Sequence, residues 1–244
     1  TGYAAPGLDV ILADEFGMTR TTQRLHIGHM GCYAALPGLV TVSDAATARG
    51  LTSLLLCVEL PSLHVQPRHS MDVEQVVSQA LFADAAAAAV VAPGVDRLHI
   101  VGFTCRTDYG HAQDMRWDVT DSGFRMGLSP RVPDLIAGHV RHLVDELLAP
   151  HCMGIDDVAR WVIHPGGPKI IDLVAEQLGL DTEVKLSRDV LSSYGNCSSA
   201  TVLLILEHLL RADPPSPGDH VVVMAFGPGL TLYAALLRAG AGTG

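Results

Sequence analysis

The stretch RLHIGHMGCYAALPGLV, residues 24–40, decides the fold because it places a thiol at an expected junction between a strand and a helix. Residues 24–30 are typical of a short strand, and residues 34–49 are typical of a helix. Cys32 would then lie near the unpaired N–H groups of the helix N-terminus, which lower a thiol pKa and favour the nucleophilic thiolate. A lone cysteine is more often a small buried apolar side chain, so both roles stay open.

The composition narrows the class of protein. With 244 residues, 48% of them hydrophobic, and a net charge of -10, the chain is typical of an ordinary globular protein. The negative charge argues against partners such as nucleic acid or an anionic membrane. Apolar runs are too short to cross a bilayer and no signal peptide is visible, so we expect a cytoplasmic protein. The five cysteines include no C-x-x-C pair, which argues against a disulfide framework and against a zinc or other metal site.

Apolar runs and helical patterns alternate along the rest of the chain. Residues 53–59, SLLLCVE, are continuously apolar up to the final glutamate, which is typical of a strand in a parallel sheet covered on both faces. Residues 133–148 carry apolar side chains at helical spacing. Residues 168–179 predict a helix that ends at Gly179, and residues 198–210 predict a buried helix that begins with serine caps. The alternation predicts an α/β fold of two similar halves.

Two further residues could join Cys32 in a catalytic site. His164 follows a predicted strand, and the carboxyl ends of strands are where open α/β sheets bind ligands, although this histidine could instead cap its loop. Asn196 precedes a predicted helix, where the simpler role is an N-cap or turn residue and the alternative is a hydrogen-bond donor aimed into a site. Papain-like proteases use cysteine, histidine and asparagine in this order, but H-M-G-C-Y does not match their C-G-[SA]-C-[WY] motif.

Seven segments, taken together, resemble the type III polyketide synthases, the chalcone and stilbene synthase family of the thiolase fold. These segments are GHMGCYAALPG, CVELPSLHVQP, SQALFADAAAA, GFRMGLSPRVPDLI, VIHPGGPKII, GNCSSATV and AFGPGLT. The resemblance implies two related βαβ halves in α/β/α/β/α layers. Residues 1–94 would be the remainder of the N-terminal half, which carries the cysteine, and residues 95–244 the C-terminal half, which carries the histidine and asparagine. Family members are longer, so we expect the N-terminal part of the first half to be missing.

The resemblance also implies the chemistry. Members of this family are homodimers that load an acyl group on the cysteine, decarboxylate malonyl-CoA and extend the chain by repeated Claisen condensation. Cys32 would be the nucleophile, while His164 and Asn196 would stabilise the thioester oxyanion and the enolate. The implied substrates are malonyl-CoA and a starter on CoA or on an acyl carrier protein, with no cofactor.

The same resemblance assigns residues to the substrate cavity. Phe82 corresponds to the family's aromatic gatekeeper, although it could simply pack in the core, and Met126 occupies the second gatekeeper position with a more adaptable side chain. Trp117 stands where plant chalcone synthases have glycine, so we expect a narrowed cavity and a short product. Further expected substrate contacts are Pro61, His64, Ser198, Phe226 and, for CoA, Lys169.

The sequence leaves three candidate functions. The stretches GYAAPGLD and GHMGCYAALPGL are most similar to actinobacterial members that make alkyl pyrones, such as germicidin synthase, which predicts a short alkyl pyrone or a resorcinol. One alternative is a β-ketoacyl carrier-protein synthase III, which performs a single condensation; HPGGPK and AFGPGLT argue against it. The other is a truncated, non-catalytic homologue that binds acyl groups or dimerises.

Overall fold

A four-stranded sheet forms the centre of the molecule. The computed structural model describes residues 4–65, 73–121 and 123–242. The sheet has the strand order β3, β8, β7, β6, in which β6 and β7 are parallel and the other neighbours are antiparallel. Its strands are β3 (Leu98–Thr107), β6 (Arg160–Ile163), β7 (His220–Gly227) and β8 (Thr231–Ala239).

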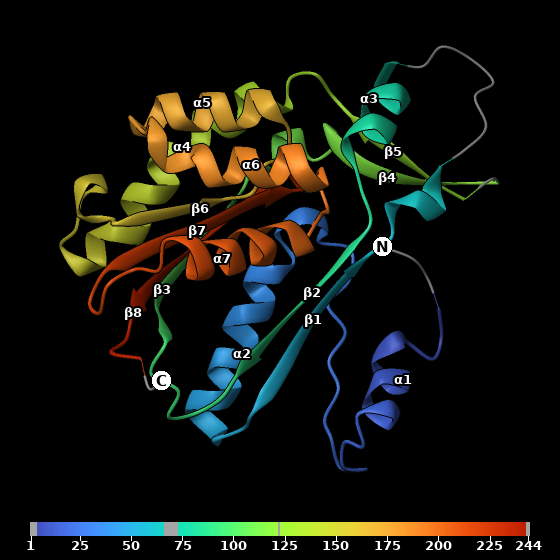
Figure 1. The fold of residues 1–244 in the computed structure, drawn as a ribbon. Coiled ribbons are helices and arrows are strands. Elements are labelled where there is room, and N and C mark those ends of the chain that lie inside the picture. The colour runs from blue at the N-terminus through green and yellow to red at the C-terminus, as the bar shows by residue number, and fades with distance from the viewer. Residues whose placement is uncertain (1–3, 66–72, 122, 243–244) are drawn as a thin grey trace.

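Helices cover both faces of this sheet (Figure 1). On one face lie α4 (Val132–Leu148) and α5 (Pro168–Leu178), and on the other lie α2 (Ala35–Arg49) and α7 (Ala200–Ala212). Side chains of β7 alternate between the two cores, as the period of two in a strand requires. Val222, Met224 and Phe226 pack toward α4 and α5. Val221, Val223 and Ala225 pack toward α2 and α7.

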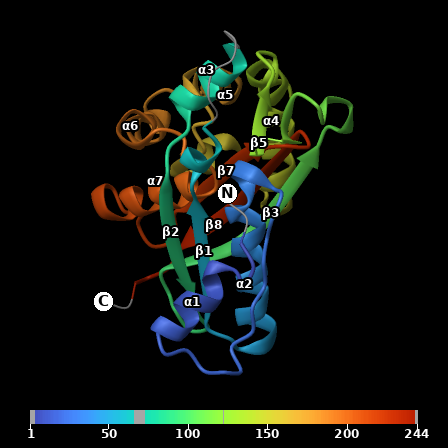
Figure 2. The ribbon, with the colours of Figure 1, turned by 90° about the vertical axis from the view of Figure 1, so that its right-hand side faces the viewer.

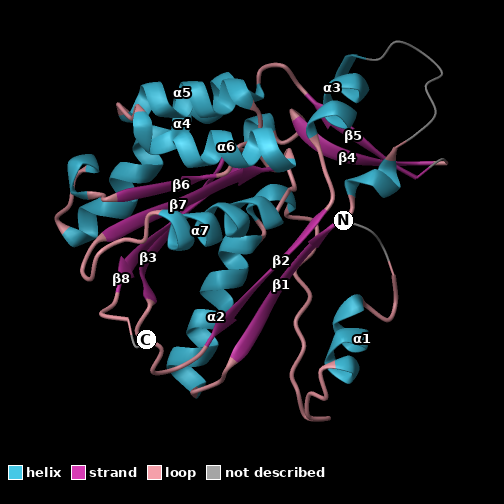
Figure 3. Ribbon diagram, in the orientation of Figure 1, coloured by secondary structure: helices cyan, strands magenta, loops and turns pink. Residues whose placement is uncertain are grey.

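A two-stranded ribbon adds a further layer. β1 (Ser53–Glu59) and β2 (Ala85–Val91) pair antiparallel, and Leu55 and Cys57 of β1 pack into the same core as α2 and α7. Figure 3 shows the resulting succession of helices, sheet, helices and ribbon among the described residues. Near one end of the ribbon lie α3 and the β4–β5 hairpin (Figure 2). The remaining elements are α1 (Leu8–Glu15), α3 (Val73–Leu81), β4 (Met115–Thr120), β5 (Gly123–Leu128) and α6 (Lys185–Tyr194).

Most of the predicted elements are confirmed. The helix predicted over residues 133–148 is α4, and the helix predicted to end at Gly179 is α5, whose C-cap Gly179 has φ 69°. The predicted buried helix is α7, but the serine caps are wrong, because no side chain caps its N-terminus. The hydroxyl of Ser199, at the N-cap position, instead donates a hydrogen bond to the Glu59 carboxylate.

Two details of the N-terminal part differ from expectation. Residues 24–30 form no strand, and at their end His29, with φ 62°, and the following Gly31, with φ 65°, have left-handed conformations that an extended strand does not use. The strand at residues 53–59 lies in an antiparallel pair and not in a parallel sheet. Its continuous apolar run arises because one face packs into the core while the alternate side chains are half-buried on the other face.

Candidate active site

Cys32 lies in a short 3₁₀ turn, Gly31–Tyr33, that leads into α2. The side chain is only 6% exposed. Gly31 permits this turn, because it has φ 65° and a Cβ atom there would lie 2.6 Å from Cδ of Pro228. The nucleophile candidate is therefore fixed by the close approach of a second turn, residues 227–230, which connects β7 to β8.

The structure brings Asn196 and the His164 loop to the Cys32 turn. The Cys32 thiol points at Oδ1 of Asn196, with 4.0 Å between sulfur and oxygen. The same Oδ1 accepts a hydrogen bond from the Ser198 backbone N–H at 2.9 Å, and Nδ2 donates to the Gly166 carbonyl at 3.4 Å. Gly166 belongs to the loop that begins at His164. Asn196 therefore serves as a turn acceptor and also joins the cysteine to the histidine loop.

Burial dominates the electrostatics of the site. Desolvation raises the pKa of the Cys32 thiol to about 12, although the hydrogen-bonding contacts with Ser198 and Asn196 act in the opposite direction. The expected lowering of this pKa by the helix N-terminus is therefore wrong, because desolvation disfavours the thiolate more strongly. Desolvation also lowers the pKa of His164 to about 3.

His164 is 1% exposed, and neither ring nitrogen has a hydrogen-bond partner within the described part of the chain. Buried polar groups without partners are rare in proteins and often belong to working sites. Because its pKa is lowered, the ring is uncharged at neutral pH, so one nitrogen can accept a proton while the other donates a hydrogen bond to a negatively charged oxygen. The arrangement can thus activate a nucleophile and stabilise the negative charge that follows.

A buried carboxylate near these residues was missed by the sequence reasoning. Glu59 ends β1, is buried, and accepts hydrogen bonds from the hydroxyl of Ser199 and, at 3.4 Å, from the Ser199 backbone N–H. Its charge further raises the pKa of Cys32 and favours a proton on His164. The available signal was an acidic residue at the end of an otherwise apolar strand.

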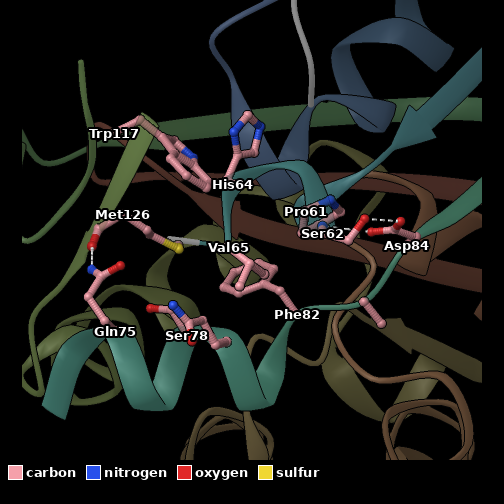
Figure 4. Close-up of a pocket in the computed structure, with 12 residues that line it drawn as sticks. Pro61, Ser62, His64, Val65, Gln75, Ser78, Phe82, Asp84, Trp117 and Met126 are labelled. Carbon is pink, nitrogen blue, oxygen red and sulfur yellow. Dashed lines mark hydrogen bonds between the residues drawn. The ribbon is translucent and has the colours of Figure 1, made fainter. Parts of the chain in front are cut away.

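A cavity of about 250 Å³ lies between α3, the β4–β5 hairpin and a short turn, Pro61–His64 (Figure 4). Five of the predicted substrate contacts line it, namely Pro61, His64, Phe82, Trp117 and Met126. The rings of His64 and Trp117 meet edge to face with their centroids 5.1 Å apart. Lining residues that the sequence reasoning missed are Ser62, Val65, Gln75, Ser78, Gln79, Ala83 and Asp84.

The other three predicted contacts lie elsewhere. Ser198 is buried beside Asn196, in the left-handed conformation with φ 50°. Phe226 does not line the cavity, because its position in β7 turns it into the core with α4 and α5. Lys169 does not line it either: its ammonium group pairs with Asp134 at 2.9 Å, and its side chain is 58% exposed. The structure therefore gives no support to a CoA contact by Lys169.

The cavity wall is hydrogen-bonded directly to the Asn196 loop. The Asn196 N–H donates to the Leu81 carbonyl at 2.9 Å, and the Ala83 N–H donates to the Asn196 carbonyl at 3.0 Å. Phe82, which lines the cavity, lies between these two bonds. A side chain predicted to contact substrate is thereby coupled through the backbone to a candidate catalytic side chain.

Gly195 should be irreplaceable at this junction. It has φ 76°, and a Cβ atom would lie 3.1 Å from the Leu81 carbonyl oxygen and 3.2 Å from Cβ of Ala83. We expect Gly195→Ala to lower the free energy of unfolding by about 2–3 kcal/mol through strain and crowding together. Gly179→Ala is the control for a positive φ without crowding, because Gly179 has φ 69° and ψ 30° with nothing within 4 Å of an added Cβ, whereas Gly195 has ψ -169°, in a region that essentially only glycine adopts. Equal losses in the two variants, measured by urea unfolding, would show that the contact with Leu81 and Ala83 is not tight.

Neither a membrane-spanning helix nor a metal site is found among the residues that the structure describes. None of their helices is long and apolar enough to cross a membrane. Within the same residues, no group of three or more histidine, cysteine, aspartate or glutamate side chains is arranged to hold a metal ion.

Comparison with known proteins identifies similar chains. The family model for chalcone and stilbene synthases, N-terminal domain, matches residues 1–95, and the model for their C-terminal domain matches residues 109–240. The chain is 35% identical to the 1,3,6,8-tetrahydroxynaphthalene synthase of Streptomyces peucetius subsp. caesius, over 98% of this chain and 65% of that protein. It is 32% identical to the alpha-pyrone synthesis polyketide synthase-like Pks18 of Mycobacterium tuberculosis, over 97% of this chain and 62% of that protein.

The likeness extends to solved structures. The crystal structure of 1,3,6,8-tetrahydroxynaphthalene synthase from Streptomyces coelicolor A3(2), a bacterial type III polyketide synthase, superposes with a TM-score of 0.92 at 29% identity. The match covers 98% of this chain and 69% of that one. The chain therefore spans less than two thirds of the length of the two curated relatives, 65% and 62%, while nearly all of it is matched.

Proposed function

The chain belongs to the chalcone and stilbene synthase family, and from this membership we propose that it acts as a type III polyketide synthase. The observation that carries the proposal is the convergence of Cys32, Asn196 and the His164 loop at one buried point. These residues lie far apart in the sequence, and a buried thiol facing an amide beside an unpaired imidazole has the parts of an acyl-transfer site.

In the proposed first step the acyl starter moves to Cys32. His164 takes the thiol proton, the sulfur attacks the thioester carbonyl, and a C–S bond forms at Cys32 as the bond to the CoA sulfur breaks. The proton goes to the departing CoA thiolate. The Cys32 thiol and the His164 imidazole are both neutral before the reaction, so the proton transfer creates a thiolate and an imidazolium in a buried site. Donors already aimed at the oxyanion are most effective there.

In the second step malonyl-CoA loses carbon dioxide, and the enolate left behind is stabilised by hydrogen bonds from His164 and Asn196. The enolate carbon attacks the acyl thioester, so a C–C bond forms and the C–S bond to Cys32 breaks. The lengthened chain, now on CoA, can reload on Cys32 for another round. His164 must donate at this stage, which a neutral imidazole does through one N–H.

The proposal includes the product class and the partners. The name of Pks18 refers to alpha-pyrone synthesis, and Trp117 lines the cavity, so we favour a short alkyl pyrone, with a resorcinol as the second form. The substrates are malonyl-CoA and a starter on CoA or on an acyl carrier protein, without a resident cofactor. The protein would work as a cytoplasmic homodimer, as the family resemblance implies.

Product analysis by mass spectrometry tests this function. The purified protein is incubated with malonyl-CoA and acyl-CoAs of increasing length. We expect products that carry more than one added C2 unit. A product with a single added unit would favour a β-ketoacyl carrier-protein synthase III, and the absence of any covalent acyl group on the protein would favour a non-catalytic homologue.

Trp117 should set the upper limit of product length. Trp117→Ala removes a large ring from the cavity wall, so we expect products with at least one more C2 unit, or acceptance of longer starters. Val119→Ala is the matched control, because Val119 lies on the same strand, is 82% exposed and does not line the cavity. An unchanged product distribution in the Trp117 variant would exclude this ring as the length determinant.

A further inference from the structure

Two histidines hold one carboxylate at the end of β3. Oδ2 of Asp108 lies 2.8 Å from Nδ1 of His111 and 2.9 Å from Nε2 of His139, while Oδ1 accepts the Gly110 N–H at 3.0 Å. His139 comes from α4, and the other residues follow β3 directly. We call Asp108, His111 and His139 the Asp108 clasp. The clasp connects the C-terminal end of β3 to α4, one of the helices that cover the sheet.

The clasp continues into the turn at residues 227–230. The Asp108 N–H donates to the Leu230 carbonyl at 2.8 Å, and the Leu230 N–H donates to the Asp108 carbonyl at 3.1 Å. The adjacent pair, Thr107 and Thr231, adds a hydroxyl contact of 3.0 Å. Leu230 is fully buried. The position of this turn is therefore set by the backbone of Asp108.

The same turn packs against the Cys32 turn. A Cβ atom at Gly227 would lie 3.3 Å from the Cys32 backbone nitrogen and 3.1 Å from the Met30 carbonyl oxygen. A Cβ atom at Gly31 would meet Pro228 at 2.6 Å. Backbones that approach this closely transmit small displacements, because packed interiors have little free space. A continuous path of contacts thus runs from α4 through Asp108 to the nucleophile candidate.

We propose that Asp108 is a positioning residue, which holds the 227–230 turn in place and through it the thiol of Cys32. The expected effect of Asp108 on turnover rests on the proposed synthase function. Its effect on the thiol itself does not depend on that function. Among the described residues, Asp108 does not line the cavity and no hydrogen bond joins it to Asn196, so we expect it to act through the turn.

The charge of the clasp supports this role. Hydrogen bonds from His139 and His111 hold the pKa of Asp108 at about 2, so the carboxylate is charged under working conditions. Beyond the clasp, Asp114 lies near His111 and is paired with Arg131 at 2.8 Å. A misplaced reacting group can lose about tenfold to a hundredfold in rate even when substrate binding is unchanged.

Asp108→Ala tests the proposal, with Asp108→Asn as the conservative variant. Asp96→Ala is the matched control, because Asp96 binds His99 at 2.7 Å at the opposite end of β3, away from the Cys32 turn. Two quantities are measured on each folded variant: kcat and KM for product formation, and the alkylation rate of Cys32 by iodoacetamide. Cys57, on β1, and Cys197, in the loop between α6 and α7, are buried thiols and serve as internal references by peptide mapping.

We expect Asp108→Ala to lower kcat about tenfold with little change in KM. The alkylation rate of Cys32 should rise relative to the rates of Cys57 and Cys197, because a displaced 227–230 turn leaves the Cys32 thiol more accessible. Asp108→Asn should recover part of both effects. The proposal is overturned if Asp108→Ala leaves the Cys32 ratio at the wild-type value, or if Asp96→Ala changes it equally. A wild-type protein without synthase activity would reject the proposed function, while the alkylation ratio would still decide on the clasp.

Discussion

Cys32→Ala protein should form no polyketide product, with a rate at least about a thousandfold below wild type. The physical reason is that the acyl chain has no other place to reside between condensations, since the sulfur is the covalent carrier. The side chain is buried and small, so its loss should leave the protein folded at a cost of about 1–2 kcal/mol. Product formation is measured by mass spectrometry at matched folded fractions.

The matched control for this result is Cys57→Ala. Cys57 is also 6% exposed and lies in the same part of the molecule, on β1, but it faces the core of α2 and α7. We expect this variant to lose stability but to keep its products. If both variants lost activity equally, the effect would be one of packing, and the nucleophile would have to be sought elsewhere.

His164 should make the protein sensitive to acid. Burial lowers its folded pKa from 6.5 to about 3, so as pH falls the unfolded chain binds the proton first. The stabilisation is complete above about pH 6.5 and is lost as pH falls toward 3, by up to about 1.4 kcal/mol per pH unit. In urea unfolding between about pH 7 and pH 4, His164→Gln should show a flatter dependence of unfolding free energy on pH than wild type.

A histidine variant elsewhere separates this effect from a general one. His142 lies on the exposed side of α4, and His142→Gln serves as the control for removing one histidine. The quantity to compare across the pH range is the difference in unfolding free energy between wild type and His164→Gln. If that difference were constant across the pH range, the ring would not be held neutral by burial, and its role as a neutral donor would be wrong.

Local pattern was sufficient to predict several elements. The apolar spacing of residues 133–148 predicted α4, and the glycine at position 179 predicted the end of α5, because both depend on neighbours in sequence. Residues 24–30 were mispredicted as a strand, since the left-handed conformation of His29 and the close approach of Met30 to Gly227 are not visible in the local pattern. The fold class was predicted correctly, but the antiparallel pairing of β1 was not, because an apolar run does not specify its partner.

The site shows the same division between local and long-range information. That Cys32, His164 and Asn196 stand at loop junctions could be inferred from sequence. The raised pKa of the thiol could not, because burial is produced by the packing of distant segments. Phe226 was predicted to line the cavity. Side chains alternate between the two faces of a strand, so a shift of one residue changes the face, and in β7 Phe226 lies on the face that packs into the core with α4 and α5.

Acylation of Cys32 is the measurement that tests the central claim most directly. The wild-type protein is mixed with an acyl-CoA in the absence of malonyl-CoA, and its intact mass is followed before digestion and peptide mapping. We predict one added acyl group, located on the peptide that contains Cys32 and absent from Cys32→Ala. An acyl group on another residue, or one that persists in Cys32→Ala, would contradict the account.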